Sequence, residues 1–251
     1  IYVLRPMITY RALELDANAA QIGLIASVYA LFPVLLALQF GKWVGRMGEA
    51  KFIIYGTLAM LVTSAGLMVA HSIFWLSIAA ACAGTAHLAC MVGGQSMVAL
   101  RAPRESYDRY FGFYTFSASV GHMLGPIVAA VVAGSNGNLP KSTSNAFLLG
   151  VVLTILALFP VIRWRNERPT VVAQQNSEGT YKTALNLVKR PGILAAIYIS
   201  LAISSAADVL VVFLPLFGTE NNFSPYAVGA ILAIRAGTTM LSRLFLGRLS
   251  E

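Results

Sequence analysis

The stretch from Phe52 to Leu100, FIIYGTLAMLVTSAGLMVAHSIFWLSIAAACAGTAHLACMVGGQSMVAL, contains no Asp, Glu, Lys or Arg in 49 residues. About 20 predominantly apolar residues are enough for one helix to cross a bilayer. The window therefore predicts two membrane-spanning helices, with His71 and Ser72 as the polar break between them. Strands of a membrane barrel alternate in polarity and are only about 10 residues long, so this stretch excludes them.

The composition of the whole chain extends this conclusion. Of its 251 residues, 57% are hydrophobic and 11% are charged, whereas a soluble domain carries about 25% charged residues. This excludes an ordinary soluble enzyme, a disordered chain and a disulfide-stapled secreted domain. The apolar runs predict spans at Ile1–Tyr10 (the end of a first helix), Ala20–Phe40, Phe52–Ala70, Ile73–Leu100, Tyr110–Ala133, Ala146–Ile162, Gly192–Phe217 and Tyr226–Leu246.

The basic residues gather on one side of the predicted membrane. Fourteen of the 18 Lys and Arg residues follow the even-numbered spans, whereas the opposite loops, 12–18 and 134–145, adjoin or contain only Arg11 and Lys141. Cytoplasmic loops carry such an excess of Lys and Arg. We therefore expect the basic side to be cytoplasmic. The net charge of +8 then reflects orientation in the bilayer, and no nucleic-acid partner is expected.

The chain divides into two membrane domains and a linker. We expect residues 1–162 to form the first domain, the polar segment 163–190 a cytoplasmic linker, and residues 191–251 the start of a second domain. Ala19–Gly45 aligns without a gap onto Pro225–Glu251, at an offset of 206 residues. Internal repeats of this kind are typical of transporters built from two halves. The first residue is not Met and the last follows a basic turn, so we expect a fragment that lacks four further spans.

The segment after the second predicted span reads GKWVGRMGEAK over residues 41–51. Glycine allows tight turns, and basic side chains pair favourably with acids and helix carboxyl ends. We expect a cytoplasmic turn that gates one side of the protein, with an ordinary basic turn as the alternative. Its residues are Gly41, Gly45, Arg46, Gly48 and Lys51, with a second copy at Gly247, Arg248 and Glu251.

The fifth predicted span contains GHMLGPIVAA over residues 121–130. Gly121 and Gly125 lie on one helix face and permit close contact with a neighbouring helix. Pro126 removes a backbone hydrogen bond and bends the helix. A bent, closely packed helix is suited to sealing one side of a moving protein, and a plain packing role is the alternative.

These two segments resemble motifs of the major facilitator superfamily, G-x-x-x-D-R-x-G-R-R and the antiporter pattern G-x-x-x-G-P-x-x-G-G. The match has exceptions, because Gly45 replaces the acid and Glu49-Ala50 replaces the basic pair. The Arg that drug antiporters carry four residues before Gly84 is Ala80 here. The resemblance implies an all-helical membrane protein of two six-helix halves that works by alternating access. It is closest to bacterial multidrug or small-solute exporters, and it implies a small-molecule substrate and a place in a bacterial inner membrane.

Three charged residues lie within or near the predicted spans, namely Arg5, Asp208 and Arg235. A charge at mid-bilayer costs at least about 2.5–3.5 kcal/mol, so such residues usually face a cavity or a partner. Asp208 appears in the sequence as the only buried acid, and we expect it to load and release a proton. The alternative is a structural ion pair with Arg5 or Arg235. The expected substrate cavity is lined by Arg5, Tyr29, Gln95, His122 and Arg235.

Three functions are compatible with these observations. The favoured one is proton-coupled export of an amphipathic compound or drug by a monomer in the bilayer. A nutrient uniporter or symporter is the first alternative, kept open by Ala80 and Gly45. A non-transporting receptor or scaffold is the second alternative. It is disfavoured because it does not explain why costly charges lie within the membrane. No metal-ligand cluster, nucleotide-binding loop or nucleophile–base pair is visible in the sequence, so we expect no metal, no cofactor and no enzyme activity.

Overall fold

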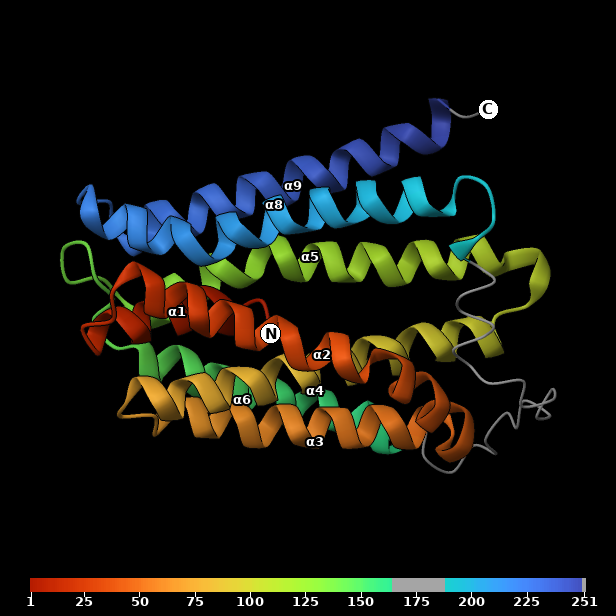
Figure 1. The fold of residues 1–251 in the computed structure, drawn as a ribbon, viewed down its shortest axis with the longest axis horizontal. Helices are drawn as coiled ribbons and strands as arrows, with labels where there is room; N and C mark the ends of the chain where they lie inside the picture. The colour runs from red at the N-terminus through yellow and green to blue at the C-terminus, as the bar shows by residue number, and fades with distance from the viewer. Residues whose placement is uncertain (164–187, 250–251) are drawn as a thin grey trace.

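The computed structural model describes residues 1–163 and 188–249, and of residues 242–249 it describes only the backbone. Most of the predicted linker and Glu251 lie outside this part of the chain. Within it the fold is helical, as predicted, apart from loops and an isolated bridge between Asn136 and Leu139. The elements are α1 (Leu4–Glu14), α2 (Ala19–Met47), α3 (Glu49–Met68), α4 (Ile73–Arg101), η1 (Arg104–Ser106), α5 (Tyr107–Ala133), α6 (Thr143–Arg163), α8 (Ile193–Glu220) and α9 (Pro225–Leu249), shown in Figure 1.

Six of the described helices, α2 to α6 and α8, are long and apolar enough to cross a membrane. Helix α1 has 11 residues, which corresponds to a length of about 16 Å and is too short to cross a hydrocarbon core of about 30 Å by itself. Helices α2 and α9 begin at Ala19 and Pro225, the two positions that the internal repeat equates. Each predicted span therefore corresponds to a helix, with ends displaced by at most four residues except at the carboxyl end of α2.

The connection between α2 and α3 differs from the prediction. Residues 41–51 are not one long turn, because α2 continues to Met47 and α3 begins at Glu49. Gly48 alone makes the connection, with a φ of 83° that L side chains rarely adopt. The helix continues because Phe40 and Val44, one turn apart, are both buried and pack against Phe52 of α3 in one apolar cluster.

The helices lie roughly along a common axis, and their connections gather at two ends (Figure 1). The loops around residues 15–18, 69–72, 134–142 and 221–224 lie at one end, here called the loop end. Gly48, residues 102–106 and the carboxyl end of α6 lie at the other, here called the basic end. The alternation of connections that the hydropathy pattern predicts is therefore present in the fold.

Helix α1 occupies the centre of the bundle. Its side chains Leu4, Met7 and Tyr10 are almost fully buried, in a cluster that includes Phe147 of α6 and Leu214 of α8. The outer faces of the other helices are apolar instead. Their exposed side chains include Val34, Val62 and Phe159, with 72%, 71% and 78% of their surface accessible. Such faces suit lipid tails, which are as apolar as leucine.

Helices α8 and α9 pack on the α1–α6 unit chiefly near the loop end. The buried residues of α8, Leu214, Pro215 and Gly218, all belong to its last turns. Residues 193–206 at its other end are exposed throughout. The buried apolar residues described in α9 run from Val228 to Ala236, which is its loop-end half. In the described part of the chain, the units are thus closed at the loop end, and α8 is exposed toward the basic end.

Candidate functional site

An ion pair joins the two units in the middle of the bundle. Arg5 of α1 donates from Nη1 to Oδ1 of Asp208 on α8 at 2.6 Å, across 203 positions of sequence. The Arg5 side chain is 16% exposed and the Asp208 side chain 54%. The guanidinium of Arg5 also lies 4.9 Å from the ring centroid of Tyr29 on α2, within cation–π range. Of the two partners considered for Asp208, the geometry therefore selects Arg5.

A cavity of about 70 Å³ surrounds this ion pair. Its walls come from the residues before α1 and from α1, α5, α8 and α9. Four of the charged or polar residues predicted for the site meet in it, although they are distant in sequence. The lining residues are Tyr2, Arg5, His122, Pro126, Ala207, Asp208, Val211, Leu232 and Arg235.

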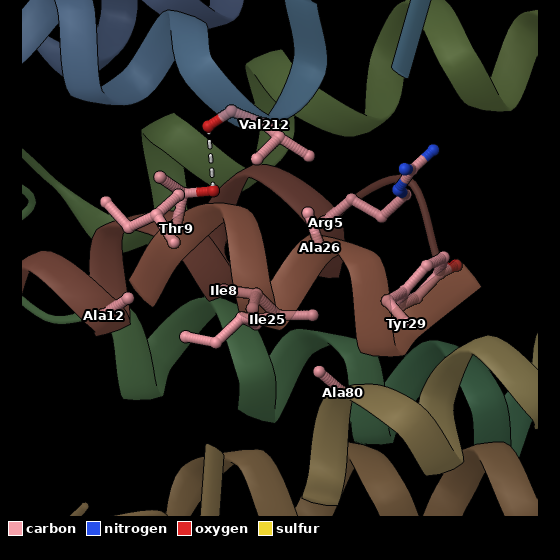
Figure 2. Close-up of a pocket in the computed structure, with 10 residues that line it drawn as sticks. Arg5, Ile8, Thr9, Ala12, Ile25, Ala26, Tyr29, Ala80 and Val212 are labelled. Carbon is pink, nitrogen blue, oxygen red and sulfur yellow. Dashed lines mark hydrogen bonds between the residues drawn. The ribbon is translucent and has the colours of Figure 1, made fainter. Parts of the chain in front are cut away.

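A second, smaller pocket of about 20 Å³ lies on the other side of Arg5, between α1, α2, α4 and α8. Figure 2 shows Arg5 beside Tyr29 toward one end of this pocket. Toward the other end, the hydroxyl of Thr9 donates to the backbone carbonyl of Val212 at 3.0 Å. Ala80, fully buried, lines the same pocket. The position where the antiporter pattern has an arginine thus lies in a pocket that Arg5 also lines.

Tyrosine and histidine side chains connect the cavity to α4. The Tyr29 hydroxyl lies 3.2 Å from Nδ1 of His87. The ring of Tyr2 stacks on His122 with centroids 3.5 Å apart and meets His87 edge-on at 6.0 Å. Sequence reasoning missed Tyr2, because nothing local distinguishes it from a packing aromatic. Gln95 lies eight residues beyond His87 on α4 and is not among the residues that line either cavity.

The glycine motif of α5 brings the first residues of the chain against the cavity. A Cβ added at Gly125 would lie 2.7 Å from Cβ of Tyr2 and 2.9 Å from its carbonyl carbon. A Cβ added at Gly121 would lie 2.9 Å from the Tyr2 ring. On the opposite side, a Cβ at Gly229 of α9 would lie 2.9 Å from the carbonyl oxygen of Pro126. The glycines of the motif therefore permit close packing within the first unit, and Gly229 permits it between the units.

At the basic end, the segment 41–51 contains a buried acid that sequence reasoning did not identify. Glu49, whose side chain is 1% exposed, accepts a hydrogen bond from Nε of Arg101 on α4 at 2.7 Å. The expectation that Asp208 is the only buried acid is therefore wrong, because Asp208 is half exposed and Glu49 is enclosed where α3 starts against α4. The sequence contained a signal for this pair, since Glu49 lies three residues before the charge-free window 52–100 and Arg101 directly follows it.

The other residues predicted to gate this end are less constrained. Arg46 and Lys51 are exposed. A Cβ added at Gly41 or Gly45 would meet nothing within 4 Å. The side chains of the second copy, at positions 247, 248 and 251, lie outside the part of the molecule that the structure describes.

The loop end is held by polar contacts between the units. The side-chain amide of Asn138 donates to the backbone carbonyl of Thr219 at 2.8 Å. Within the first unit, Glu14 accepts hydrogen bonds from Arg11 at 2.8 Å and from Thr143 at 2.7 Å. These contacts reinforce the apolar packing that closes this end.

A large apolar groove lies apart from these charges. It has a volume of about 1010 Å³ and is lined by residues of α2, α3 and α4, none of them charged. Its lining includes the exposed side chains Phe32, Tyr55 and Val62. The groove thus belongs to the outer, lipid-compatible surface, and the charged cavity is the candidate functional site.

Comparison with known proteins finds a matching family model and similar multidrug resistance proteins. The family model of the Major Facilitator Superfamily matches residues 1–251. Multidrug resistance protein 1 of Bacillus subtilis is 24% identical over 146 residues, which are 58% of this chain and 38% of the relative. The Lactococcus lactis homolog of the multi-drug resistance efflux pump PmrA is 23% identical over 239 residues, covering 91% of this chain and 56% of the relative.

A solved structure shares the fold. It is a mutant of the peptide transporter POT in complex with sulfate, with a TM-score of 0.56 and 15% sequence identity. The match covers 86% of this chain and 48% of that one. The chain thus spans about half the length, or less, of the relatives it matches.

Proposed function

The chain belongs to the major facilitator superfamily, and we propose that it moves a small amphipathic compound or drug out of the cell by proton-coupled alternating access. The names of its relatives, which are multidrug resistance and efflux proteins, support export. The family is one of transporters, in agreement with the expectation that the chain is not an enzyme. The substrate, the coupling ion and the direction are part of the proposal.

The observation that carries proton coupling is the ion pair between Arg5 and Asp208. It is the ion pair that joins the two units in the described part of the chain, and it lines the central cavity. A proton on Asp208 removes the carboxylate charge that holds Arg5, and the contact between α1 and α8 weakens. Loss of the proton restores the pair and draws the units together. Protonation is thereby linked to the distance between the units, as proton-driven rocking requires.

The packing supports alternating access from one particular state. The units are closed at the loop end by Leu214, Pro215 and the Asn138 contact, and the described part of α8 is exposed toward the basic end. With the basic end in the cytoplasm, as the positive-inside rule predicts, this is the inward-facing state. Gly229 of α9 provides the close contact with Pro126 at which α9 moves against α5.

The absence of an arginine at position 80 does not oppose proton coupling. Arg5 lines the same small pocket as Ala80 and is already paired with Asp208. We propose that Arg5 supplies the cation that drug antiporters carry on the fourth span. A nutrient uniporter or symporter remains the second candidate, favoured by Gly45 in place of the acid of the basic-end motif. A scaffold is disfavoured, because charges within a membrane are costly and usually functional.

We further propose that the protein works as a monomer in a bacterial inner membrane, with the bilayer, the substrate and protons as its partners. Its apolar outer faces and the charge asymmetry of its turns support this placement. The basic end carries Lys42, Arg46, Lys51, Arg101, Arg104 and Arg109.

The test uses full-length protein reconstituted in liposomes with a panel of anionic, neutral and cationic amphipathic dyes. For each dye that the wild type transports, Asp208→Asn should abolish accumulation driven by a pH gradient. Exchange of the same dye at equal pH should persist, because the cavity itself remains. Asp16→Asn, in the exposed α1–α2 loop at a positive φ that asparagine tolerates, is the matched control. Gradient-driven accumulation by Asp208→Asn at the wild-type rate would refute coupling through this residue.

A further inference from the structure

The charges of the central cavity do not balance among the described residues. Two guanidinium groups, Arg5 and Arg235, and a single carboxylate, Asp208, line it. Arg5 and Asp208 neutralise one another through their ion pair. Arg235 takes part in none of the ion pairs formed by the described residues, and its Nε is buried without a hydrogen-bond partner.

An uncompensated arginine at this depth requires a physical reason. The guanidinium does not lose its proton in proteins, so the charge persists at any physiological pH. Leaving a buried charged donor without a partner costs more free energy than leaving a neutral donor unpaired. The other titratable side chains that line the cavity are Tyr2 and His122, and neither supplies a negative charge when neutral. The missing partner is therefore an anion from outside the described chain.

We propose that Arg235 binds the carboxylate of an amphipathic organic acid, which is the substrate of this transporter. The proposal rests on the proposed function, because it takes the cavity to be the substrate site. Arginine binds a carboxylate with two parallel hydrogen bonds, a geometry that suits its planar group. The apolar wall beside Arg235, formed by Pro126, Val211 and Leu232, contacts the hydrocarbon part of the acid next to its head group.

The cavity is large enough for the head group of a ligand but too small for a whole drug molecule. Pockets for drug-sized ligands measure about 300–1,000 Å³, whereas this cavity measures about 70 Å³. It accommodates a carboxylate and a few adjoining carbons in the observed state. The rest of the molecule extends past Asp208, the most exposed charged group of the cavity, toward the basic end, where α8 is exposed.

The same charges disfavour a lipophilic cation. The one acid available to attract it, Asp208, is already bound to Arg5. A cation entering the cavity would meet two guanidinium groups and displace the ion pair before gaining a partner. An organic acid, in contrast, can pair with Arg235 without breaking the Arg5–Asp208 ion pair, which stays available for proton coupling.

The experiment uses full-length protein in detergent and three probes with the same ring, 1-naphthoate, 1-naphthamide and 1-naphthylmethylammonium. Affinity is measured from the concentration dependence of thermal unfolding, since a ligand that binds the folded state stabilises it. We expect naphthoate to stabilise the wild type, with much weaker effects of the amide and the ammonium. Arg235→Gln should weaken naphthoate binding about 10- to 100-fold, the usual loss of a charge-assisted contact. Arg235→Lys should recover part of the affinity.

Lys141→Gln is the matched control, because it removes an exposed cation from the loop end, far from the cavity, and should leave binding unchanged. The selectivity among the three probes tests the wild type alone, so the inference stays testable if Arg235→Gln does not fold. Preference for the ammonium probe, absence of stabilisation by naphthoate, or equal naphthoate affinity of Arg235→Gln and wild type would overturn it. Binding is measured without transport, so naphthoate binding with failed gradient-driven flux would reject only the proposed coupling.

Discussion

The buried ion pair at the start of α3 predicts a large and specific loss of stability. Glu49→Gln keeps the shape and a hydrogen-bond acceptor but removes the charge that faces Arg101 at 2.7 Å. A hydrogen bond to a charged group contributes about 1.5–3 kcal/mol to stability. A carboxylate in the first turn of a helix adds about 0.3–1 kcal/mol through the helix dipole. We therefore expect the free energy of unfolding to fall by roughly 2–4 kcal/mol.

The assay is equilibrium unfolding in mixed micelles, followed by tryptophan fluorescence. Glu105→Gln is the matched control, because Glu105 lies at the same end of the molecule but is exposed, and surface changes of this kind usually stay within about 0.5 kcal/mol. A double variant, Glu49→Gln with Arg101→Gln, should be less destabilised than the sum of the single variants, because the two residues are in contact. If Glu49→Gln and Glu105→Gln unfold alike, or if the single effects add, the ion pair does not stabilise this end as argued.

Two further predictions concern one contact within the first unit and one between the units. Gly125→Ala should lower the free energy of unfolding by about 1–3 kcal/mol, since its Cβ would lie 2.7 Å from that of Tyr2. Gly112→Ala on the same helix meets nothing within 4 Å and should be neutral or mildly stabilising; equal effects would contradict this packing. Asn138→Ala should open the loop end, measured as faster labelling of a cavity cysteine by a membrane-impermeant reagent in a variant without native cysteines. Asn145→Ala, an exposed asparagine at the same end, should leave that rate unchanged, and a rate unaltered by Asn138→Ala would argue against the contact.

Helix number and connection order were predictable, because both depend on local properties. The free energy of placing a side chain in lipid is set residue by residue, so the charge-free window 52–100 was sufficient for two helices. The alternation of loops between two ends then followed from chain continuity. The same reasoning failed for the turn after α2, where glycines suggested a break. Helical packing of Phe40 and Val44 against Phe52 carried the helix on to Met47.

The candidate site was predictable only in its composition. Scarcity of charge in the membrane singled out Arg5, Asp208 and Arg235, and the structure gathers all three around one cavity. Which of them pair did not follow from the sequence, nor did the burial of Glu49 or the contribution of Tyr2. Gln95 and His122 are both polar residues within predicted spans, so the sequence did not distinguish them. His122 lines the central cavity, whereas Gln95 lines neither cavity.

The sequence by itself determined that the protein is helical and spans a membrane, and which family motifs it carries, because hydropathy and spacing are properties of neighbouring residues. Only the tertiary structure decided that Arg5 neutralises Asp208 and leaves Arg235 to line the same cavity. That decision depends on the packing of α1 against α8, where contacts join positions 203 residues apart, and on the packing of α9 against α5. Pairing at such separation is fixed by how apolar surfaces and glycine faces pack, and packing is a property of the whole bundle.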